Sequence, residues 1–464
     1  MWSIACSLPL AVAAAVRADT MDQALSKAYQ NNPQLNSQRA VVRETDEGVP
    51  QALSGYRPTV TATATTGHQY TSNLAKGATS TGVPTYTRAD AAYTPSTMNL
   101  TARQTIFNGY QTANRTRLAE TNTSAAREAL RVAEQTVLLA AATAYMDLLR
   151  DAALLELQRR NVEVLQEQLR QTRDRFIAGE VTRTDTAQAE TNLAQGRASV
   201  LTAEAQYARS KATYRQVIGV EAGNLQAASP VDRLSPRRLT DAIELGRARH
   251  PNVGVAVFGI DAAVLQVKIA EGTLYPNVAL TGTVAQAWET AGATALSSAL
   301  QQFNAFVLGQ ITVPLYQGGA EYSLIRQSKE TVGQKRIDLE TARDAVQANV
   351  VTTWAQLEAS KAQINATETQ VASAAIALDG VREEARVGQR TTFDVLQAII
   401  ALVTARTALV TAQHDRVVAS YTLLAAVGEL NLPKLGVNLP LYDPMIHYQQ
   451  VRDAWIGVRT PDGR

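Results

Sequence analysis

The feature that most constrains this chain is a turn that it contains twice. Residues 177–193 read IAGEVTRTDTAQAETNL, and residues 386–402 read RVGQRTTFDVLQAIIAL. In each segment an aspartate follows a glycine by six residues, and a leucine follows the aspartate by eight. Similarity that recurs at a fixed spacing indicates a duplicated structural unit. We therefore expect two copies of one unit, each containing a turn of this kind.

Prolines and glycines define the two copies. Pro33 and Pro251 lie 218 residues apart, whereas Gly219 and Gly428 lie 209 apart, so the first copy carries nine more residues before its long helix. We expect a first repeat at 19–228, a second at 229–432 and a C-terminal tail at 433–464. Each copy is predicted to run helix, strand, strand, long helix, helix. The expected ranges are strands at about 58–70, 96–107, 276–288 and 306–316, long helices at about 110–176 and 320–385, and following helices at about 184–218 and 392–428.

The long helices are predicted from apolar residues spaced by seven, a pattern typical of a coiled-coil seam. The seam residues are Leu148, Leu155, Val162 and Leu169 in the first copy, and Leu357, Ile364, Val371 and Leu378 in the second. A helix of about 67 residues is about 100 Å long, several times the width of a globular domain. Such a rod argues against a globular enzyme.

The predicted strands carry a weak membrane signal. In residues 276–288, Val278, Leu280 and Val284 fall on one face, and strands of this length suit a tilted transmembrane β-strand. Tyr56, Tyr275 and Tyr316 lie at strand ends, where an interfacial aromatic girdle would be expected. Two ordinary solvent-exposed hairpins are the alternative. Four strands are too few for a bacterial barrel, so a membrane assignment requires several protomers to share one barrel.

Composition and charge narrow the functional classes. The net charge is +2, which gives no indication of a nucleic-acid partner, and the four histidines are scattered without metal-ligand spacing. Residues 1–18 resemble a secretory signal peptide, with a short buried segment as the alternative. No 18-residue apolar stretch follows it, so we expect no membrane-spanning helix. The polar segments 71–95 and 289–302 are expected to be outward-facing loops.

Taken together, the signal peptide, the duplicated unit and the turn VGQRTTFDVL resemble the TolC family of outer-membrane channels, over roughly residues 19–432. The strand-to-helix segments 106–115 and 315–327 are also similar to that family. The resemblance implies a homotrimer whose twelve strands form one outer-membrane β-barrel, continued by a periplasmic helical barrel. It implies partnership with a periplasmic adaptor and an inner-membrane pump, for drug efflux or type I protein secretion. It implies no cofactor and no catalysis.

The resemblance also assigns roles to residues at the turns. Asp394 would face a periplasmic constriction as a ring of like charge, and the family's second acid is Gln397 here, so the ring would hold three carboxylates rather than six. Arg390 would form a gate latch with Asp185. The turn residues that would accept the adaptor are Gly179, Val387, Gly388 and Thr391.

Simpler structural roles remain open for the same residues. Thr184, Thr391 or Thr392 could cap the following helices, with Asp185 and Asp394 favourable near a helix N-terminus. The glycines could be ordinary C-cap residues. A soluble periplasmic coiled-coil adaptor is the alternative function, although adaptors carry one helical hairpin rather than two copies with strands between the helices.

Overall fold

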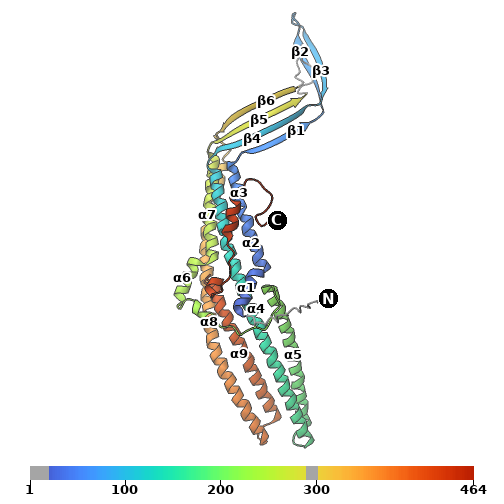
Figure 1. Ribbon diagram of the computed structural model, residues 1–464, viewed down its shortest axis with the longest axis vertical. Helices are drawn as coiled ribbons and strands as arrows, with labels where there is room; N and C mark the ends of the chain where they lie inside the picture. Colours follow the sequence, from blue (N-terminus) through green and yellow to red (C-terminus); the bar gives the residue numbers. More distant parts are fainter. Residues whose placement is uncertain (1–19, 289–300, 464) are drawn as a thin grey trace, which may run out of the picture. The chain divides into compact units, whose positions relative to one another are not determined.

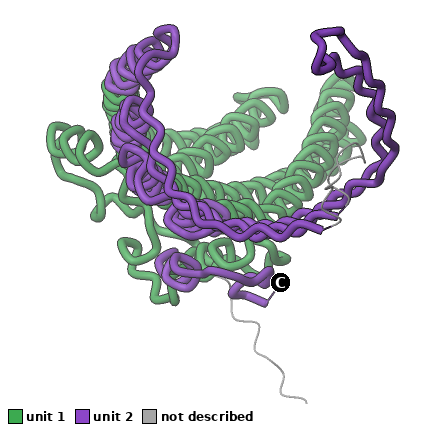
Figure 2. The backbone as a smooth tube through the Cα atoms, turned by 90° about the horizontal axis from the view of Figure 1, so that it is seen from above, with its two compact units in different colours: residues 1–42, 126–256, 339–443 green, residues 43–125, 257–338, 444–464 purple. Residues whose placement is uncertain are grey.

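A computed structural model describes residues 20–288 and 301–463. The expected signal peptide, and most of the expected loop at 289–302, therefore lie outside the described residues. The described chain divides into two compact units, shown in different colours in Figure 2. Unit 1 contains residues up to 42 together with 126–256 and 339–443, and unit 2 contains 43–125, 257–338 and the residues from 444 onward.

Unit 1 is helical (Figure 1). Its elements are α1 (Met21–Asn31), most of α2 (Pro33–Asp46), α5 (Arg183–Ile218), η2 (Asp232–Leu234), α6 (Leu239–Arg249), the start of α7 (Pro251–Glu271), α9 (Thr392–Ala426), α10 (Leu432–Leu435), and parts of the two 67-residue helices α4 (Gln111–Ile177) and α8 (Ala320–Arg386).

Unit 2 holds the strands. Its elements are α3 (Gly48–Leu53), η1 (Ser54–Tyr56), β1 (Thr59–Thr66), β2 (Gln69–Ala78), β3 (Pro84–Tyr93), β4 (Ser96–Asn108), η3 (Gly272–Leu274), β5 (Asn277–Trp288), β6 (Gln301–Thr312) and α11 (Pro444–Val451), with the remaining parts of α2, α4, α7 and α8.

The repeated prolines and glycines mark equivalent boundaries in the two copies. Pro33 and Pro251 each occupy the first residue of a helix, where the missing N–H of proline carries no cost. Gly219 and Gly428 each follow a helix with φ of +84°, a conformation that glycine adopts without strain. The duplication seen in the sequence is therefore a duplication of helix boundaries.

The apolar residues spaced by seven on the two long helices are buried or partly buried, as expected of a packing seam. Leu148, Leu155 and Leu169 on α4 and Leu357 and Leu378 on α8 are all buried, and the other seam positions are partly buried. Unit 1 has two separate apolar clusters. The larger gathers α1, α4, α5 and α9 around Tyr145, Tyr214 and Leu424 among others, and the smaller joins α4, α5, α8 and α9 near the turns.

Four strands form one antiparallel sheet in the order β1-β4-β5-β6, and β2 and β3 form a separate hairpin. A bulge shifts the register of β4 between Thr105 and Phe107. Both outer strands, β1 and β6, have a neighbour on one side only within the described residues. The sheet therefore has two open edges.

Three details of unit 2 and of the helices differ from the sequence-based expectations. Segment 71–95 is largely the β2–β3 hairpin rather than a loop, because its alternating Thr, Tyr and Ala residues suit strands. The sixth strand covers 301–312 rather than 306–316, since Pro314 cannot donate to a ladder. Two helical stretches, 239–274 and 392–426, are long and apolar enough to cross a membrane by length and composition alone, which the sequence argument did not anticipate.

Candidate functional site

The two repeated turns have the same local structure. In the first, the Thr182 hydroxyl accepts a hydrogen bond from the Asp185 N–H, and the Asp185 carboxylate accepts one from the Thr182 N–H, at 3.3 and 2.9 Å. In the second, Thr391 and Asp394 repeat both bonds at 3.3 and 3.0 Å. Each pair is a capping box that satisfies otherwise unpaired N–H groups at the start of α5 or α9. The cap of α5 is therefore Thr182, two residues before the expected Thr184.

The helices before the turns end on glycines with positive φ. Gly179 has φ of +80° and Gly388 of +78°, and a side chain at either position would meet open space. The next residue in each turn donates back to the long helix, Glu180 to the Arg175 carbonyl and Gln389 to the Glu384 carbonyl, both at 2.9 Å. These bonds are those of a Schellman cap. The glycines thus serve as caps, and their exposed position leaves the turn backbone accessible.

The ion pairs at the two turns are reversed in charge. In the first turn the Arg175 Nε lies 3.0 Å from the Glu180 carboxylate, and in the second the Arg390 Nε lies 2.8 Å from the Glu384 carboxylate. Glu384 is the repeat equivalent of Arg175. The structure of one chain therefore pairs Arg390 with Glu384 and Asp185 with Thr182, and it does not bring Arg390 and Asp185 together.

The capping contacts keep both aspartates ionised. Hydrogen bonds from the backbone and side chain of Thr391, with a smaller contribution from Arg390, lower the pKa of Asp394 below its ordinary value. The side chain and backbone of Thr182 lower the pKa of Asp185 in the same way. Asp394 and Gln397 lie three residues apart on α9 and so share one face of the helix. Gln397 and Val387 are exposed.

The capping role of Thr391 can be tested without changing the charge of Asp394. Replacing Thr391 with alanine removes the hydroxyl that accepts from the Asp394 N–H and is expected to cost about 1 kcal/mol of local helix stability. Amide hydrogen exchange at Asp394 and Val395 should then be faster. Thr391→Ser keeps the hydroxyl and is the matched control, with exchange close to that of the parent. Equal exchange in the alanine variant would contradict the capping role.

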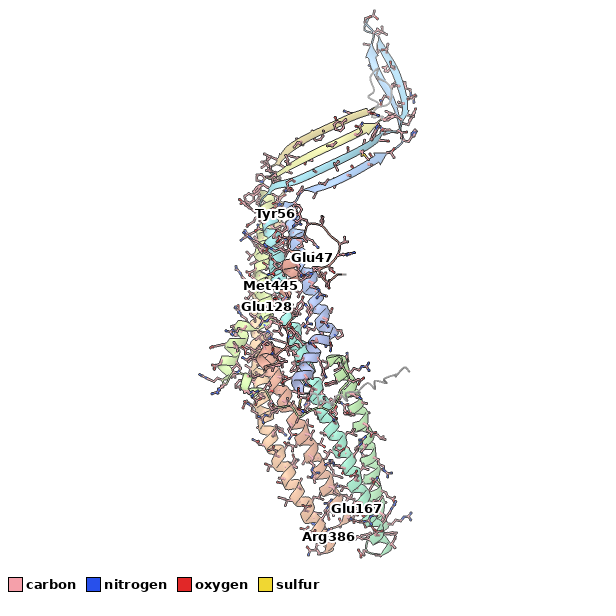
Figure 3. All side chains as sticks on the ribbon, viewed as in Figure 1. Glu47, Tyr56, Glu128, Glu167, Arg386 and Met445 are labelled. Carbon is pink, nitrogen blue, oxygen red and sulfur yellow. The ribbon has the colours of Figure 1, made fainter. Side chains whose placement is uncertain are left out.

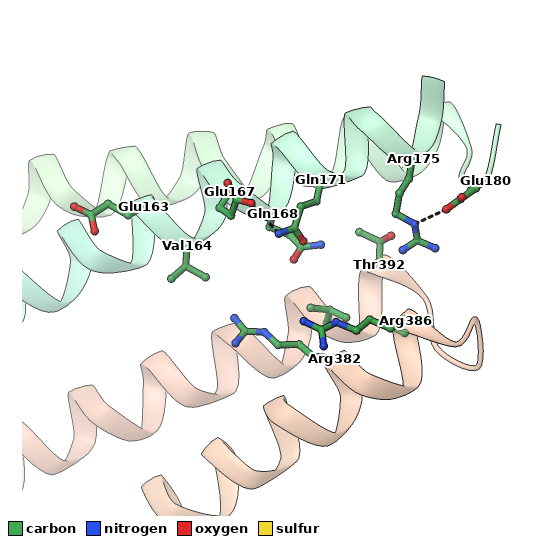
Figure 4. A pocket seen from close by; sticks show the side chains of 12 residues that line it. Glu163, Val164, Glu167, Gln168, Gln171, Arg175, Glu180, Arg382, Arg386 and Thr392 are labelled. Atoms are coloured by element: carbon green, nitrogen blue, oxygen red, sulfur yellow. Dashed lines mark hydrogen bonds and ion pairs between the residues drawn. The ribbon is translucent and has the colours of Figure 1, made fainter. Parts of the chain in front are cut away.

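An open groove of about 680 Å³ lies between α4 and the first turn on one side and α8 and the start of α9 on the other. Figure 4 shows Arg382 and Arg386 of α8 on one side and Glu167 and Gln168 of α4 on the other. Glu167 is ionised throughout the ordinary pH range, because hydrogen bonds from Arg170 and Gln171 lower its pKa to about 2. The groove is therefore polar and carries both signs of charge.

The groove was not anticipated from the sequence. Arg382 and Arg386 are four residues apart, as are Glu163 and Glu167, and this spacing places each pair on one face of its helix. That spacing was the available signal. The spacing within each helix does not show that α8 faces α4 across the groove.

A partly buried polar cluster inside unit 1 was also missed. His414 of α9 lies 3.0 Å from Asp147 of α4 and 2.9 Å from its neighbour Asp415. Arg150 lies 2.9 Å from Asp147 and 2.9 Å from the buried Asp151. These contacts join α4 and α9. Among residues 20–288 and 301–463, no group of histidine, cysteine and carboxylate side chains could hold a metal ion.

The strand register gives the four-stranded sheet one continuous apolar face. In adjacent strands, Ala62 pairs with Leu100, Leu100 with Val284, and Gly282 with Val307, and directly paired residues point to the same face. The exposed apolar side chains on that face are Val60, Met98, Leu100, Leu280, Val284, Phe303, Val307 and Ile311, and the polar Gln104 and Gln286 lie toward its two ends. The other face carries mainly threonines, together with Asn99 and Arg103 and, on β6, Phe306 and Leu308. This alternation is typical of a transmembrane β-strand, with apolar side chains toward lipid and polar ones toward a lumen.

Three tyrosines mark the same end of the sheet. Tyr56 lies just before β1, Tyr275 just before β5, and Tyr316 after β6, and all three are exposed. Tyr275 also makes an edge-to-face contact with Tyr110, with ring centroids 6.5 Å apart. The tyrosines named from the sequence therefore share one level at the base of the strands in unit 2.

Comparisons with known proteins agree with this geometry. The family model described as "Outer membrane efflux protein" matches residues 24–220 and 242–429. The outer membrane efflux protein BepC of Brucella suis is 40% identical over 451 residues, covering 97% of this chain and 94% of BepC. The outer membrane protein TolC of Vibrio cholerae is 28% identical and covers 91% of this chain and 95% of TolC.

Two further matches extend the comparison. The alkaline protease secretion protein AprF of Pseudomonas aeruginosa is 26% identical, covering 74% of this chain and 72% of AprF. The crystal structure of the Campylobacter jejuni CmeC outer membrane channel superposes with a TM-score of 0.73 at 15% identity, covering 93% of this chain and 89% of CmeC. At that identity the superposition supports the fold alone.

Proposed function

Because this chain belongs to the outer membrane efflux protein family, we propose that three copies form one outer-membrane channel with a twelve-stranded barrel and a periplasmic helical tunnel. The membership itself establishes an outer-membrane efflux or secretion protein whose relatives are transport proteins rather than enzymes. What the proposal adds is the closed barrel, the trimer and the roles of particular residues.

The observation that carries the proposal is the apolar face of the sheet together with its two open edges. An unpaired strand edge cannot remain in lipid, where no water is available for its N–H and C=O groups. One chain supplies β1 at one edge and β6 at the other. Pairing β6 of one copy with β1 of the next satisfies both edges, and three copies give twelve strands.

A channel of this kind receives its exported substrate from partner proteins. We propose that an inner-membrane pump and a periplasmic adaptor deliver it, as the resemblance to the TolC family implies, and that the channel conducts it passively. The relatives include an efflux protein and a protease secretion protein. Both drug efflux and type I protein secretion are therefore consistent with the fold.

The second turn is proposed to form the periplasmic constriction. Its Asp394 is held at the start of α9 by the capping box and remains ionised, which suits a ring of three carboxylates. Gln397 on the same helix face adds polarity without charge. The cap and the ring are compatible, because the contacts to Thr391 that hold the side chain also keep it negative.

The latch and the docking turns are proposed at the same end of the helices. Arg390 would exchange Glu384 for Asp185 when the mouth closes, as a guanidinium readily does between two carboxylates. The exposed turn residues Gly179, Val387 and Gly388 would accept the tip of the adaptor. Thr391 contributes to this surface, with its hydroxyl already engaged in the cap.

The tyrosines at the base of the strands are proposed to lie in the membrane interface. Tyr56, Tyr275 and Tyr316 are exposed, and tyrosine rings concentrate where the apolar core of a bilayer meets the headgroups. Their common level supports an interfacial girdle facing outer-membrane lipid.

Extraction and reconstitution test the proposal. The mature protein should require detergent for release from membranes, run as a trimer, and give discrete channels in planar bilayers. A matched variant is Val307→Asp on the apolar face, which should prevent insertion, since a charge facing lipid costs about 2–4 kcal/mol for basic residues and somewhat less for acidic ones. Release without detergent would instead support the soluble adaptor, which the family membership does not favour.

A further inference from the structure

The C-terminal segment of the chain is tied to unit 2 by specific contacts. Helix α11 buries Val451, and His447 lies 3.0 Å from the fully buried Asp46. Beyond the helix, Arg452 lies 3.6 Å from Glu120 of α4. The segment is therefore packed against the helices of unit 2, whereas the sequence assigned it no role. Figure 3 labels Met445 at the start of α11 and Tyr56 at the base of the strands.

Arg57 brings the end of this segment to the base of the sheet. Its Nη1 donates a hydrogen bond of 2.6 Å to the Ala454 carbonyl, and its guanidinium lies 4.4 Å from the centre of the Trp455 ring. Arg57 is separated from the first residue of β1, Thr59, by a single residue. Trp455 is thereby held next to the point where the chain enters the sheet.

The residues held there are apolar and exposed. Trp455 is 68% exposed, Ile456 96% and Val458 99%. Arg57 and Arg459 flank them. A tryptophan with aliphatic neighbours and arginines is the combination that stabilises a segment in the interface between acyl chains and phosphates. Exposure of three such side chains to water alone would be unfavourable.

We propose that residues 455–458 insert into the periplasmic leaflet of the membrane that the strands cross, as a second contact with phospholipid outside the barrel. This inference rests on the proposed barrel, because the position of β1 sets the level of the membrane. Arg57 is its positioning residue. It holds the segment by a hydrogen bond to the Ala454 carbonyl and by the position of its guanidinium over the Trp455 ring, while the phosphates of the leaflet complement its charge.

Nitroxide labels in lipid nanodiscs test the proposal on the mature, full-length protein. The single cysteine, Cys6, lies in the expected signal peptide, so one introduced cysteine gives one label. The test site is Ile456→Cys. Val307→Cys on the apolar face of β6 is the lipid control, and Ile177→Cys, 84% exposed at the end of α4, is the water control. Each label is scored by its collision rate with oxygen relative to a water-soluble nickel chelate.

The expected result is a ratio at residue 456 several-fold above that at 177 and below that at 307, because residue 456 would lie near the headgroups whereas Val307 lies in the middle of β6. A ratio at 456 equal to that at 177 would place the segment in water and overturn the inference while leaving the barrel intact. Low collision with both reagents would mean that the segment packs against a neighbouring protomer, which also overturns it. A water-like ratio at 307 would overturn the proposed barrel, and this inference with it.

Arg57→Gln tests the positioning role. The variant loses the charge over Trp455, and the ratio at residue 456 is expected to fall at least twofold toward water while that at 307 is unchanged. An unchanged ratio at 456 would show that Arg57 does not hold the segment in the membrane.

Discussion

Asp394→Asn is expected to remove most of the cation preference of the reconstituted channel, with the cation-to-anion permeability ratio falling on the order of tenfold. Asparagine can still accept the hydrogen bonds that Asp394 accepts from the Thr391 N–H and hydroxyl, so the cap of α9 is kept and only the charge is lost. Three charges leave the constriction at once, because each protomer contributes one. The measurement is the reversal potential in a salt gradient across a planar bilayer.

Asp185→Asn is the matched control for this prediction. Asp185 has the same capping contacts to Thr182 and the same lowered pKa, but it lies at the other turn. Its substitution is expected to raise the conductance by releasing the proposed latch, but it should leave the permeability ratio within about twofold of the parent. Equal losses in the two variants would mean that the charge of the whole mouth, rather than a ring of Asp394, sets the selectivity.

The pH dependence follows from the direction of the pKa shift. Because the pKa of Asp394 is lowered, the carboxylate remains charged as the pH falls past the ordinary value for aspartate, about 3.9. In the proposed ring the mutual repulsion of three carboxylates acts against these contacts, so the cation preference should be constant from pH 7 to about pH 5 and should fall at lower pH. The contribution of the capping contacts to stability has the same sign: it is present above the unfolded pKa and is lost only as the pH falls through the lower folded value.

Much of the fold could be predicted from the sequence because its main signals are periodic. Leu148, Leu155 and Leu169 fall on one seven-residue repeat and each is buried, and Pro33 and Pro251 begin equivalent helices. Each of these signals lies within a single helix or strand, so it can be read without knowing which elements contact each other. The alternation of apolar and polar residues within each strand was also visible in the sequence, but it is weak evidence in any one strand. The register between the strands places the apolar residues of all four on the same face.

The rest depended on contacts between distant segments. The β2–β3 hairpin was hidden by polar threonines, which occur in loops as well as in strands. The pairing of His447 with Asp46 joins residues 401 positions apart, and no periodic pattern reports such a contact. At the turns, the sequence placed Asp185 and Asp394 correctly near helix starts, yet the cap partner Thr182 and the Arg390–Glu384 pair required coordinates.

The ion pair at the second turn has a consequence for the proposed gate. In one chain Arg390 is bound to Glu384, and both bonds from Thr182 to Asp185 end on the same carboxylate oxygen, Oδ2. The other oxygen of Asp185 is therefore available to a guanidinium. The first turn has Val181 at the position equivalent to Arg390, so each protomer carries one arginine of this kind. Glu384 and Asp185 then compete for it.

This competition predicts opposite effects from two substitutions at one ion pair. Arg390→Ala removes the latch and should raise the single-channel conductance several-fold, whereas Glu384→Gln releases Arg390 toward Asp185 and should lower the conductance or the open time. Asp185→Asn should raise the conductance, and the double variant Arg390→Ala with Asp185→Asn should add little to either single change. If the pair with Glu384 only stabilises the turn, both substitutions that break it would change the conductance in the same direction.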